Sequence, residues 1–151
     1  MSDRVCLVTG VGPGTGSALV RRFAAGGYQV AMLARTESRL RELAAEVPGA
    51  SAFPCDVADG AQIGATLTRI ARELGPVSVL IHNAVGGAWG DFQQIEPDVL
   101  QRNFATNTMA LLHLARGVAP AMLEAGEGTI LVTGNTSAYR GRANFAGFAP
   151  T

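Results

Sequence analysis

The chain has 151 residues, 48% of them hydrophobic and 16% charged, which is enough for one compact domain with a substantial buried core. Twelve basic residues balance twelve acidic ones, so no net field favours nucleic acid or an anionic membrane surface, and a small-molecule ligand is expected. No segment offers the roughly 18 uninterrupted apolar residues of a membrane span, and no signal peptide is evident, so we expect a cytoplasmic protein.

The residue types that are rare or absent also limit the chemistry. All twelve basic residues are arginine, so the given sequence has no lysine that could serve in a P-loop or form a Schiff base. Cys6 and Cys55 are too few for a disulfide framework, lack the spacing of metal ligands and lie in strand-like runs. We therefore expect two buried structural thiols and no metal site.

Short runs rich in β-branched residues alternate along the chain with longer segments of helical periodicity. Strands are expected at residues 5–9, 29–34, 51–55, 78–82 and 129–133. Helices are expected at 15–25, from 36 or 37 to 47, from 60 to about 74 with Asp59 as the cap, and from 97 toward 123, where Pro120 is a candidate kink. Residues 134–151 show no clear period.

This alternation is typical of repeated βαβ units and predicts an α/β fold with a Rossmann-type, doubly wound parallel sheet. We expect a single domain over residues 1–151. A sheet that stops after about five strands leaves an edge that is usually covered or paired, so we expect these residues to be the N-terminal part of a longer protein.

A glycine-rich turn follows the first strand and opens the first helix, with Gly10, Gly14 and Gly16 in the pattern T-G-x-x-x-G-x-G. Glycines in such a turn let the backbone approach a pyrophosphate, and the N-terminus of a helix favours negative charge. The spacing resembles the cofactor motif of the short-chain dehydrogenase/reductase family. Taken alone, the motif is also compatible with a tight strand-to-helix turn.

Later motifs resemble the same family and follow in the same order. Arg35 comes directly after the second strand, where an arginine suits the 2′-phosphate of NADP(H) and an acidic residue would suit NAD(H). Asp56 precedes a valine, like the family's adenine-binding pair, and Asn83 lies in an element similar to the family's Asn-Asn-Ala-Gly. The resemblance implies a cofactor site of Gly10, Pro13, Gly14, Thr15, Gly16, Arg35, Asp56, Val57, Asn83, Ala84 and Val85, with NADP(H) favoured and NAD(H) as the alternative.

The active-site residues implied by the resemblance depart from the family pattern. Asn107 matches the family's active-site asparagine, but Asn135 occupies the serine position and Phe148 the tyrosine position, and the lysine position would follow the last residue. Phenylalanine has no ionisable proton and cannot act as a general acid or base. Asn135 can still donate a hydrogen bond to a developing oxyanion, and a one-residue slip would place Thr136 or Ser137 in the serine role.

Three further features are interpreted from their residue types. His82 is expected to make a structural hydrogen bond. Trp89 is expected either to line a substrate pocket or to pack over the neighbouring helix. The apolar positions of the helix expected from residue 97 toward 123 fit two buried faces, which indicates a homo-oligomer, either a dimer or a tetramer. A packed core alone would also explain most of this pattern. These positions are Leu111, Leu112, Leu114 and Val118.

The resemblance implies an oxidoreductase that uses NADP(H) to transfer a hydride between the nicotinamide and a carbonyl or alcohol substrate. A non-catalytic NAD(P)-binding or scaffold module that has lost the tyrosine is the alternative. A third interpretation, an unrelated α/β ligand-binding protein, requires the ordered set of motifs to be coincidental.

Overall fold

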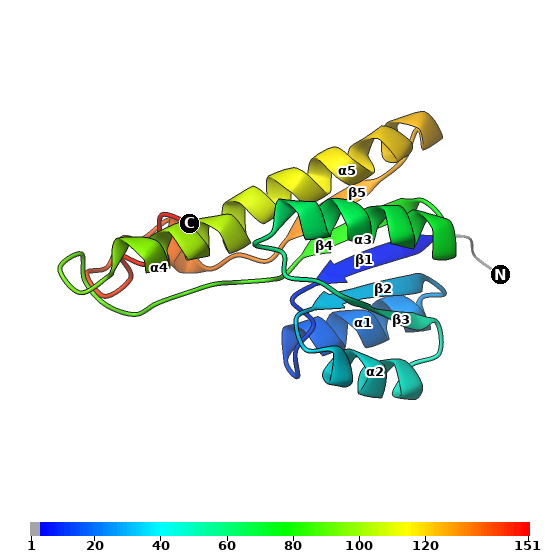
Figure 1. Cartoon of the computed structure of the whole chain (residues 1–151), viewed down its shortest axis with the longest axis horizontal. Helices are drawn as coiled ribbons and strands as arrows, with labels where there is room; N and C mark the ends of the chain where they lie inside the picture. The colour runs from blue at the N-terminus through cyan, green and yellow to red at the C-terminus, as the bar shows by residue number, and fades with distance from the viewer. Residues whose placement is uncertain (1–3) are drawn as a thin grey trace.

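The computed structural model describes residues 4–151 and contains a five-stranded parallel sheet (Figure 1). The strands are β1 (Val5–Thr9), β2 (Gln29–Ala34), β3 (Ala50–Pro54), β4 (Val77–His82) and β5 (Thr129–Val132). Their order in the sheet is β3-β2-β1-β4-β5, so the direction of winding reverses after β3. This order confirms the predicted doubly wound, Rossmann-type sheet, whose ligand crevice lies at the carboxyl ends of β1 and β4.

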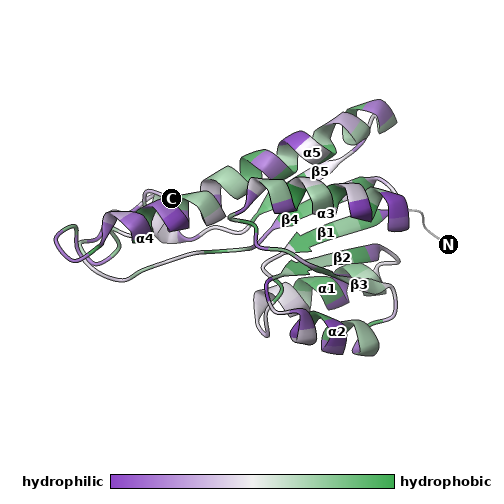
Figure 2. Cartoon of the chain, in the orientation of Figure 1, coloured by the Kyte–Doolittle hydropathy of each residue, from purple (hydrophilic) through white to green (hydrophobic). Residues whose placement is uncertain are grey.

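Helices cover both faces of the sheet. They are α1 (Thr15–Ala25), α2 (Glu37–Glu46), α3 (Gly60–Glu73), α4 (Pro97–Phe104) and α5 (Ala110–Ala125). On β1, Cys6 and Val8 pack in the core beneath α1 and α2, while Val5 and Leu7 pack in the core beneath α3 and α5. Because both faces are buried, the central strands are apolar along their length, as Figure 2 shows.

The turn into α3 is fixed by the cap that the sequence predicts. The Asp59 carboxylate accepts hydrogen bonds from the N–H groups of Ala61 at 2.9 Å and Gln62 at 3.1 Å. The hydrogen bonds from Gln62 are the main reason that the pKa of Asp59 is lowered. The cap fixes where α3 begins, and so sets the length of the loop that connects the carboxyl end of β3 to this helix.

The long helical region after β4 is interrupted at a place that the sequence does not indicate. α4 continues through the π-helical turn η1 (Ala105–Met109) into α5. α5 continues through Pro120, the candidate for a kink, so the helix does not end at that residue. Nothing in the local sequence of η1 marks the interruption, since it contains neither glycine nor proline.

β5 forms one edge of the sheet, and all four of its residues are exposed. Beyond the carboxyl ends of the strands, α4 and the loops that flank it extend as an arm, and the C-terminal segment returns along this arm (Figure 1). Within residues 4–151, no helix combines the length and the apolar character that a bilayer crossing needs.

Candidate functional site

Two cavities open at the carboxyl end of the sheet, and Ala84 and Val85 line both of them. The larger cavity has a volume of about 510 Å³ and is lined by Asn107, Asn135 and Phe148, among others. The smaller, of about 270 Å³, contains the adenosine-side residues of the predicted site. The candidate catalytic residues therefore gather on one side of the segment after β4, and the candidate adenosine-binding residues on the other.

The glycine-rich turn is shaped by two close approaches of the backbone. Gly10 has a φ of +66°, and a Cβ on it would lie 2.5 Å from the Cα of Ala84. A Cβ on Gly16 would lie 2.5 Å from the carbonyl oxygen of Gly10. These two positions therefore need glycine for the fold. Gly14 is different, since a Cβ there would meet no protein atom within 4 Å.

The first turn of α1 can accept an anion. Its N-cap makes no side-chain hydrogen bond and the first turn carries no acidic residue. Ser17 and Ala18 donate their N–H groups to carbonyls within the turn, whereas the N–H groups of Thr15 and Gly16 find no acceptor among residues 4–151. Free amide donors at the positive end of a helix dipole, beside a glycine that leaves open space, fit a pyrophosphate.

Three arginines from three elements line the smaller cavity. Arg35 follows β2, Arg39 lies on α2 and Arg102 lies on α4. None of them forms an ion pair with a described residue. The cavity wall therefore carries cations whose partner would have to be a ligand. Sequence reasoning found Arg35 but missed the other two, although Arg39 lies one helical turn beyond Arg35.

Another part of the wall of the smaller cavity comes from the loop after β3. Asp56, Val57 and Cys55 line it. The Asp56 carboxylate accepts a hydrogen bond from the N–H group of Ala58 at 3.0 Å, which holds the loop. Cys55 is buried, as predicted, and its burial raises the pKa of its thiol. Cys6 is buried in β1, where desolvation raises its pKa to about 12.

His82, at the end of β4, joins three segments under the larger cavity. Its Nδ1 lies 3.0 Å from the Oγ1 of Thr9, and its Nε2 lies 3.2 Å from the carbonyl oxygens of both Thr106 and Asn107. Thr9 Oγ1 also accepts the N–H groups of Asn83 and Ala84, each at 3.1 Å. These are the structural hydrogen bonds that the sequence predicts for His82.

Asn107 projects from η1 and clamps the loop after β4. Its Oδ1 accepts the N–H of Gly86 at 2.7 Å, and its Nδ2 donates to the carbonyl of Gly86 at 2.8 Å. The same Nδ2 donates to Thr151 Oγ1 at 2.7 Å. The amide therefore joins η1, the loop after β4 and the C-terminal segment at the wall of the larger cavity.

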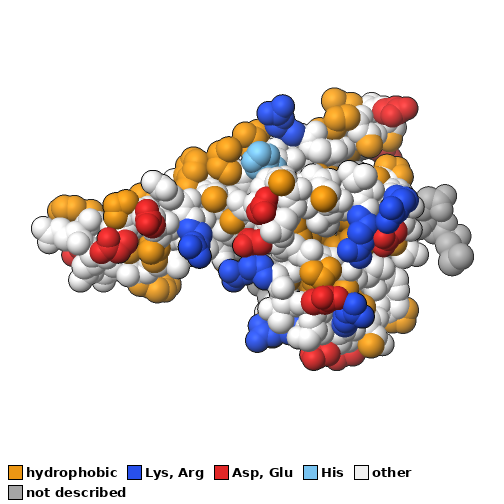
Figure 3. All heavy atoms as spheres, viewed as in Figure 1, with side chains coloured by type: hydrophobic (Ala, Val, Ile, Leu, Met, Phe, Trp, Pro, Cys, Tyr) orange, Lys and Arg blue, Asp and Glu red, His pale blue; other side chains and the backbone are white. Residues whose placement is uncertain are grey.

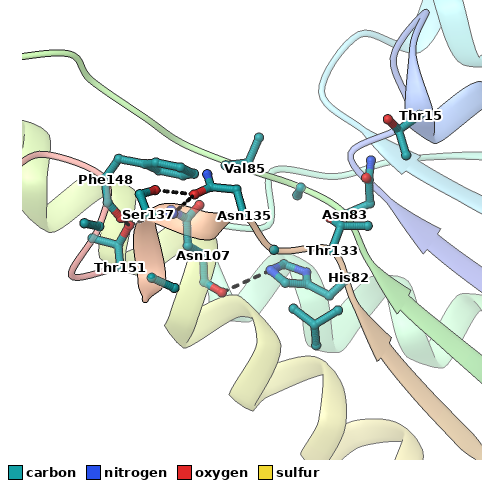
Figure 4. A pocket seen from close by; sticks show the side chains of 15 residues that line it. Thr15, His82, Asn83, Val85, Asn107, Thr133, Asn135, Ser137, Phe148 and Thr151 are labelled. Carbon is teal, nitrogen blue, oxygen red and sulfur yellow. Dashed lines mark hydrogen bonds between the residues drawn. The ribbon is translucent and has the colours of Figure 1, made fainter. Parts of the chain in front are cut away.

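Asn135 lies at the start of the 3₁₀ turn η2 (Thr136–Ala138) and lines the same cavity as Asn107 (Figure 4). Its Oδ1 accepts from the N–H of Ser137 at 2.7 Å and from the Ser137 hydroxyl. Because a backbone N–H can only donate, this contact fixes Oδ1 toward Ser137 and leaves Nδ2 as a donor toward the cavity. Ser137 is the residue that orients this amide, a role that the sequence did not suggest.

Phe148 lines the larger cavity and leaves it without an acid or base of the expected kind. Among the described residues that line this cavity, His82 is the one with a titratable side chain, and its ring is held by the hydrogen bonds to Thr9 and η1. A Cβ on Gly87 would lie 3.5 Å from the Phe148 ring, so the ring packs against the loop after β4. The nearby Trp89 is 77% exposed, lines neither of these two cavities and makes an edge-to-face contact with Phe145, with ring centroids 4.7 Å apart. Its ring therefore packs against the C-terminal segment and not over a helix, and its role at a substrate pocket stays a prediction.

This arrangement is that of an NAD(P)-binding Rossmann fold. The chain belongs to the short-chain dehydrogenase family, whose model matches residues 4–150. It is 29% identical over 99% of its length to 2,3-dihydro-2,3-dihydroxybenzoate dehydrogenase from Bacillus subtilis (strain 168), of which it covers 59%. It is also similar to D-erythrulose reductase from Gallus gallus, with 31% identity over 98% of this chain and 59% of the relative.

Among solved structures, a metagenomic short-chain oxidoreductase in complex with NADP is similar, with a TM-score of 0.93 and 28% identity. That match covers 99% of this chain and 70% of the other. The chain spans 47% to 61% of the length of eight curated relatives that it matches.

Proposed function

We propose that this chain holds NADP(H) across the carboxyl ends of β1 and β4, and that the protein transfers hydride between the cofactor and a small carbonyl or alcohol substrate. The observation that carries the proposal is the position of the first turn of α1. Thr15, which carries one of the free N–H groups, lines the amide-lined cavity, and residues 10–12 of the same glycine-rich turn line the arginine-lined cavity. A dinucleotide fits this arrangement because its pyrophosphate lies between an adenosine end and a nicotinamide end, which would each occupy one cavity.

The three arginines favour NADP(H) over NAD(H). A guanidinium presents a planar fork of donors that suits a phosphate, and the 2′-phosphate is the group that separates the two cofactors. Asp56 is the one carboxylate among the residues that line this cavity, and it already accepts the N–H of Ala58. The charge of this wall therefore suits the 2′-phosphate of NADP(H) better than the free 2′-hydroxyl of NAD(H).

The larger cavity would hold the reacting end of the substrate. The bound nicotinamide would supply or accept the hydride there. Asn135 offers its Nδ2 to the substrate oxygen, on which negative charge develops during carbonyl reduction. Phe148 forms an apolar wall and cannot donate a proton, so the proton comes from water or from another group.

A calorimetric titration of the full-length protein with NADPH and with NADH tests the cofactor assignment. We expect tighter binding of NADPH. A panel of uncharged aldehydes and ketones, followed by the absorbance of NADPH, then tests turnover. Binding without turnover, together with no gain in Phe148→Tyr, would support the non-catalytic alternative. Binding of neither dinucleotide would refute both forms of the proposal.

We also propose that the protein forms a homo-oligomer through the outer surface of α4 and α5. Leu114 and Val118 are buried against the sheet and belong to the core, but Leu112 is 47% exposed and Leu123 is 81% exposed. Figure 3 shows hydrophobic side chains along this edge of the molecule. Light scattering should give a dimer or tetramer, with a smaller mass for Leu112→Asp; a monomeric wild type would refute this assignment.

A further inference from the structure

His82 is buried, with 2% of its surface exposed, and the proposed hydride transfer does not use it. It nevertheless occupies the centre of the hydrogen-bond network beneath the larger cavity. On one side it contacts Thr9 of β1, and on the other it contacts the carbonyls of Thr106 and Asn107 in η1. Figure 4 shows the contact with Asn107. A buried imidazole with partners at both nitrogens can be assigned a protonation state by counting donors and acceptors.

The count begins at Thr9. Its hydroxyl oxygen accepts two backbone N–H groups, from Asn83 and Ala84, so both lone pairs are used. Its single proton is then available for Nδ1 of His82 at 3.0 Å. On the other side, carbonyl oxygens can only accept, so Nε2 carries a proton and donates to Thr106 and Asn107. The network therefore requires neutral His82 protonated at Nε2.

This network connects the two parts of the proposed site. Thr9 holds Asn83 and Ala84, and the Asn83 Nδ2 donates to the carbonyl of Gly10 at 3.0 Å, which supports the glycine-rich turn. At the other end, η1 carries Asn107, which clamps Gly86. A change at His82 therefore reaches both the cofactor side and the substrate side through direct contacts.

We propose that His82 is a positioning residue that holds η1 against the cofactor-binding turn only while it is neutral, and that its protonation releases Asn107 and weakens cofactor binding. The predicted effect on cofactor binding rests on the proposed function. The structural part, a coupling between the proton on His82 and the position of η1, does not depend on that function.

Protonation disrupts the network because the second N–H, on Nδ1, would face an oxygen whose lone pairs are already occupied. It would also place a positive charge on a ring whose partners among the described residues include no anion. Within residues 4–151, the groups that contact the His82 ring are neutral: the Thr9 hydroxyl from β1 and the carbonyls of Thr106 and Asn107 from η1. The N–H of Thr133, after β5, donates to the backbone carbonyl of His82 and not to the ring. Burial is the main cause that lowers the pKa of His82, and the two carbonyl hydrogen bonds oppose it.

The structural part is tested by NMR of the ¹⁵N-labelled full-length protein, with the imidazole signals assigned by their loss in His82→Asn. We expect the tautomer protonated at Nε2 and a titration midpoint below 6.5, the ordinary value. The amide signals of Gly86 and Thr108 should shift with the same midpoint. In His82→Asn, whose side chain offers an NH₂ group as donor and an oxygen as acceptor but does not titrate, this shared transition should be absent. A proton on Nδ1, or a titration that leaves both amides unmoved, would overturn the proposal.

The consequence for binding is tested by measuring NADPH and NADH affinity as a function of pH in wild type and in His82→Asn. The 2′-phosphate has its own titration near pH ~6, so NADH is included as a probe without it. Wild type should lose up to about tenfold in affinity for each pH unit below the His82 midpoint, and the variant should lack this step. Equal pH profiles in the two proteins would refute the coupling to binding. If neither dinucleotide binds at any pH, the proposed function fails, and the NMR titration still decides the role of His82.

Discussion

Replacing Arg35 by alanine should weaken NADPH binding and leave NADH binding nearly unchanged. A hydrogen bond to a charged group contributes about 1.5–3 kcal/mol, which corresponds to roughly 10-fold to 150-fold in Kd. Arg35 and Arg39 are both exposed, so water and salt screen their attraction for the phosphate. We therefore expect the low end, about tenfold for each arginine, and a larger combined loss in the double variant.

Calorimetry at two ionic strengths measures the effect, because the contribution of an exposed arginine to phosphate binding should shrink as salt is added. Arg41→Ala is the matched control. Arg41 lies on the same helix as Arg39 but pairs with Glu37 at 2.6 Å and does not line the smaller cavity. An equal loss for NADPH and NADH in Arg35→Ala would refute a role at the 2′-phosphate, and so would an equally large loss in the control.

Three further predictions concern stability and reactivity. Gly10→Ala should lower the free energy of unfolding by more than about 2 kcal/mol in urea titrations, because positive φ alone costs ~1–2 kcal/mol and the Cβ would clash with Ala84. Gly12→Ala, where a Cβ meets nothing within 4 Å, is its control, and equal losses would contradict the close approach. Asn107→Ala should lower the same free energy by about 1–3 kcal/mol through loss of its hydrogen bonds to Gly86; an unchanged urea midpoint would contradict the clamp. Cys6, with its pKa raised to about 12, should resist iodoacetamide at pH 8 in the folded protein and react in urea.

The strands and the doubly wound, parallel class of sheet could be predicted because the strand and helix patterns that indicate them are local; the strand order β3-β2-β1-β4-β5 was not itself among the predictions. Buried parallel strands are short apolar runs, and glycine-rich or proline-rich turns separate them from amphipathic helices. The bounds of β1 and β2 are those predicted, whereas β3, β4 and β5 differ from the predictions by one residue; β3, for example, ends at Pro54 rather than at Cys55. Such ends depend on the register between neighbouring strands, which a single segment does not contain.

The parts of the site that were not predicted depend on contacts between distant segments. Arg102 reaches the adenosine side because α4 returns past the loop after β4, and no spacing in the sequence marks this proximity. Ser137 orients Asn135 through a turn that has no periodic signal. The interruption at η1 lies where His82, more than twenty residues earlier in the chain, contacts two helix carbonyls.

The π-helical turn also sets the rotational phase between the helices on either side of it. An α-helix advances by about 100° per residue, so an additional residue accommodated in a wide turn rotates everything after it by roughly that angle. Leu114, Val118 and Met122 of α5 all face the core in the phase that results. A chain shortened by one residue within η1 would rotate these side chains toward solvent unless α5 also slid along its axis. The turn that presents Asn107 is therefore also what aligns α5 with the sheet, so insertions and deletions should be tolerated less here than in the loop before α4.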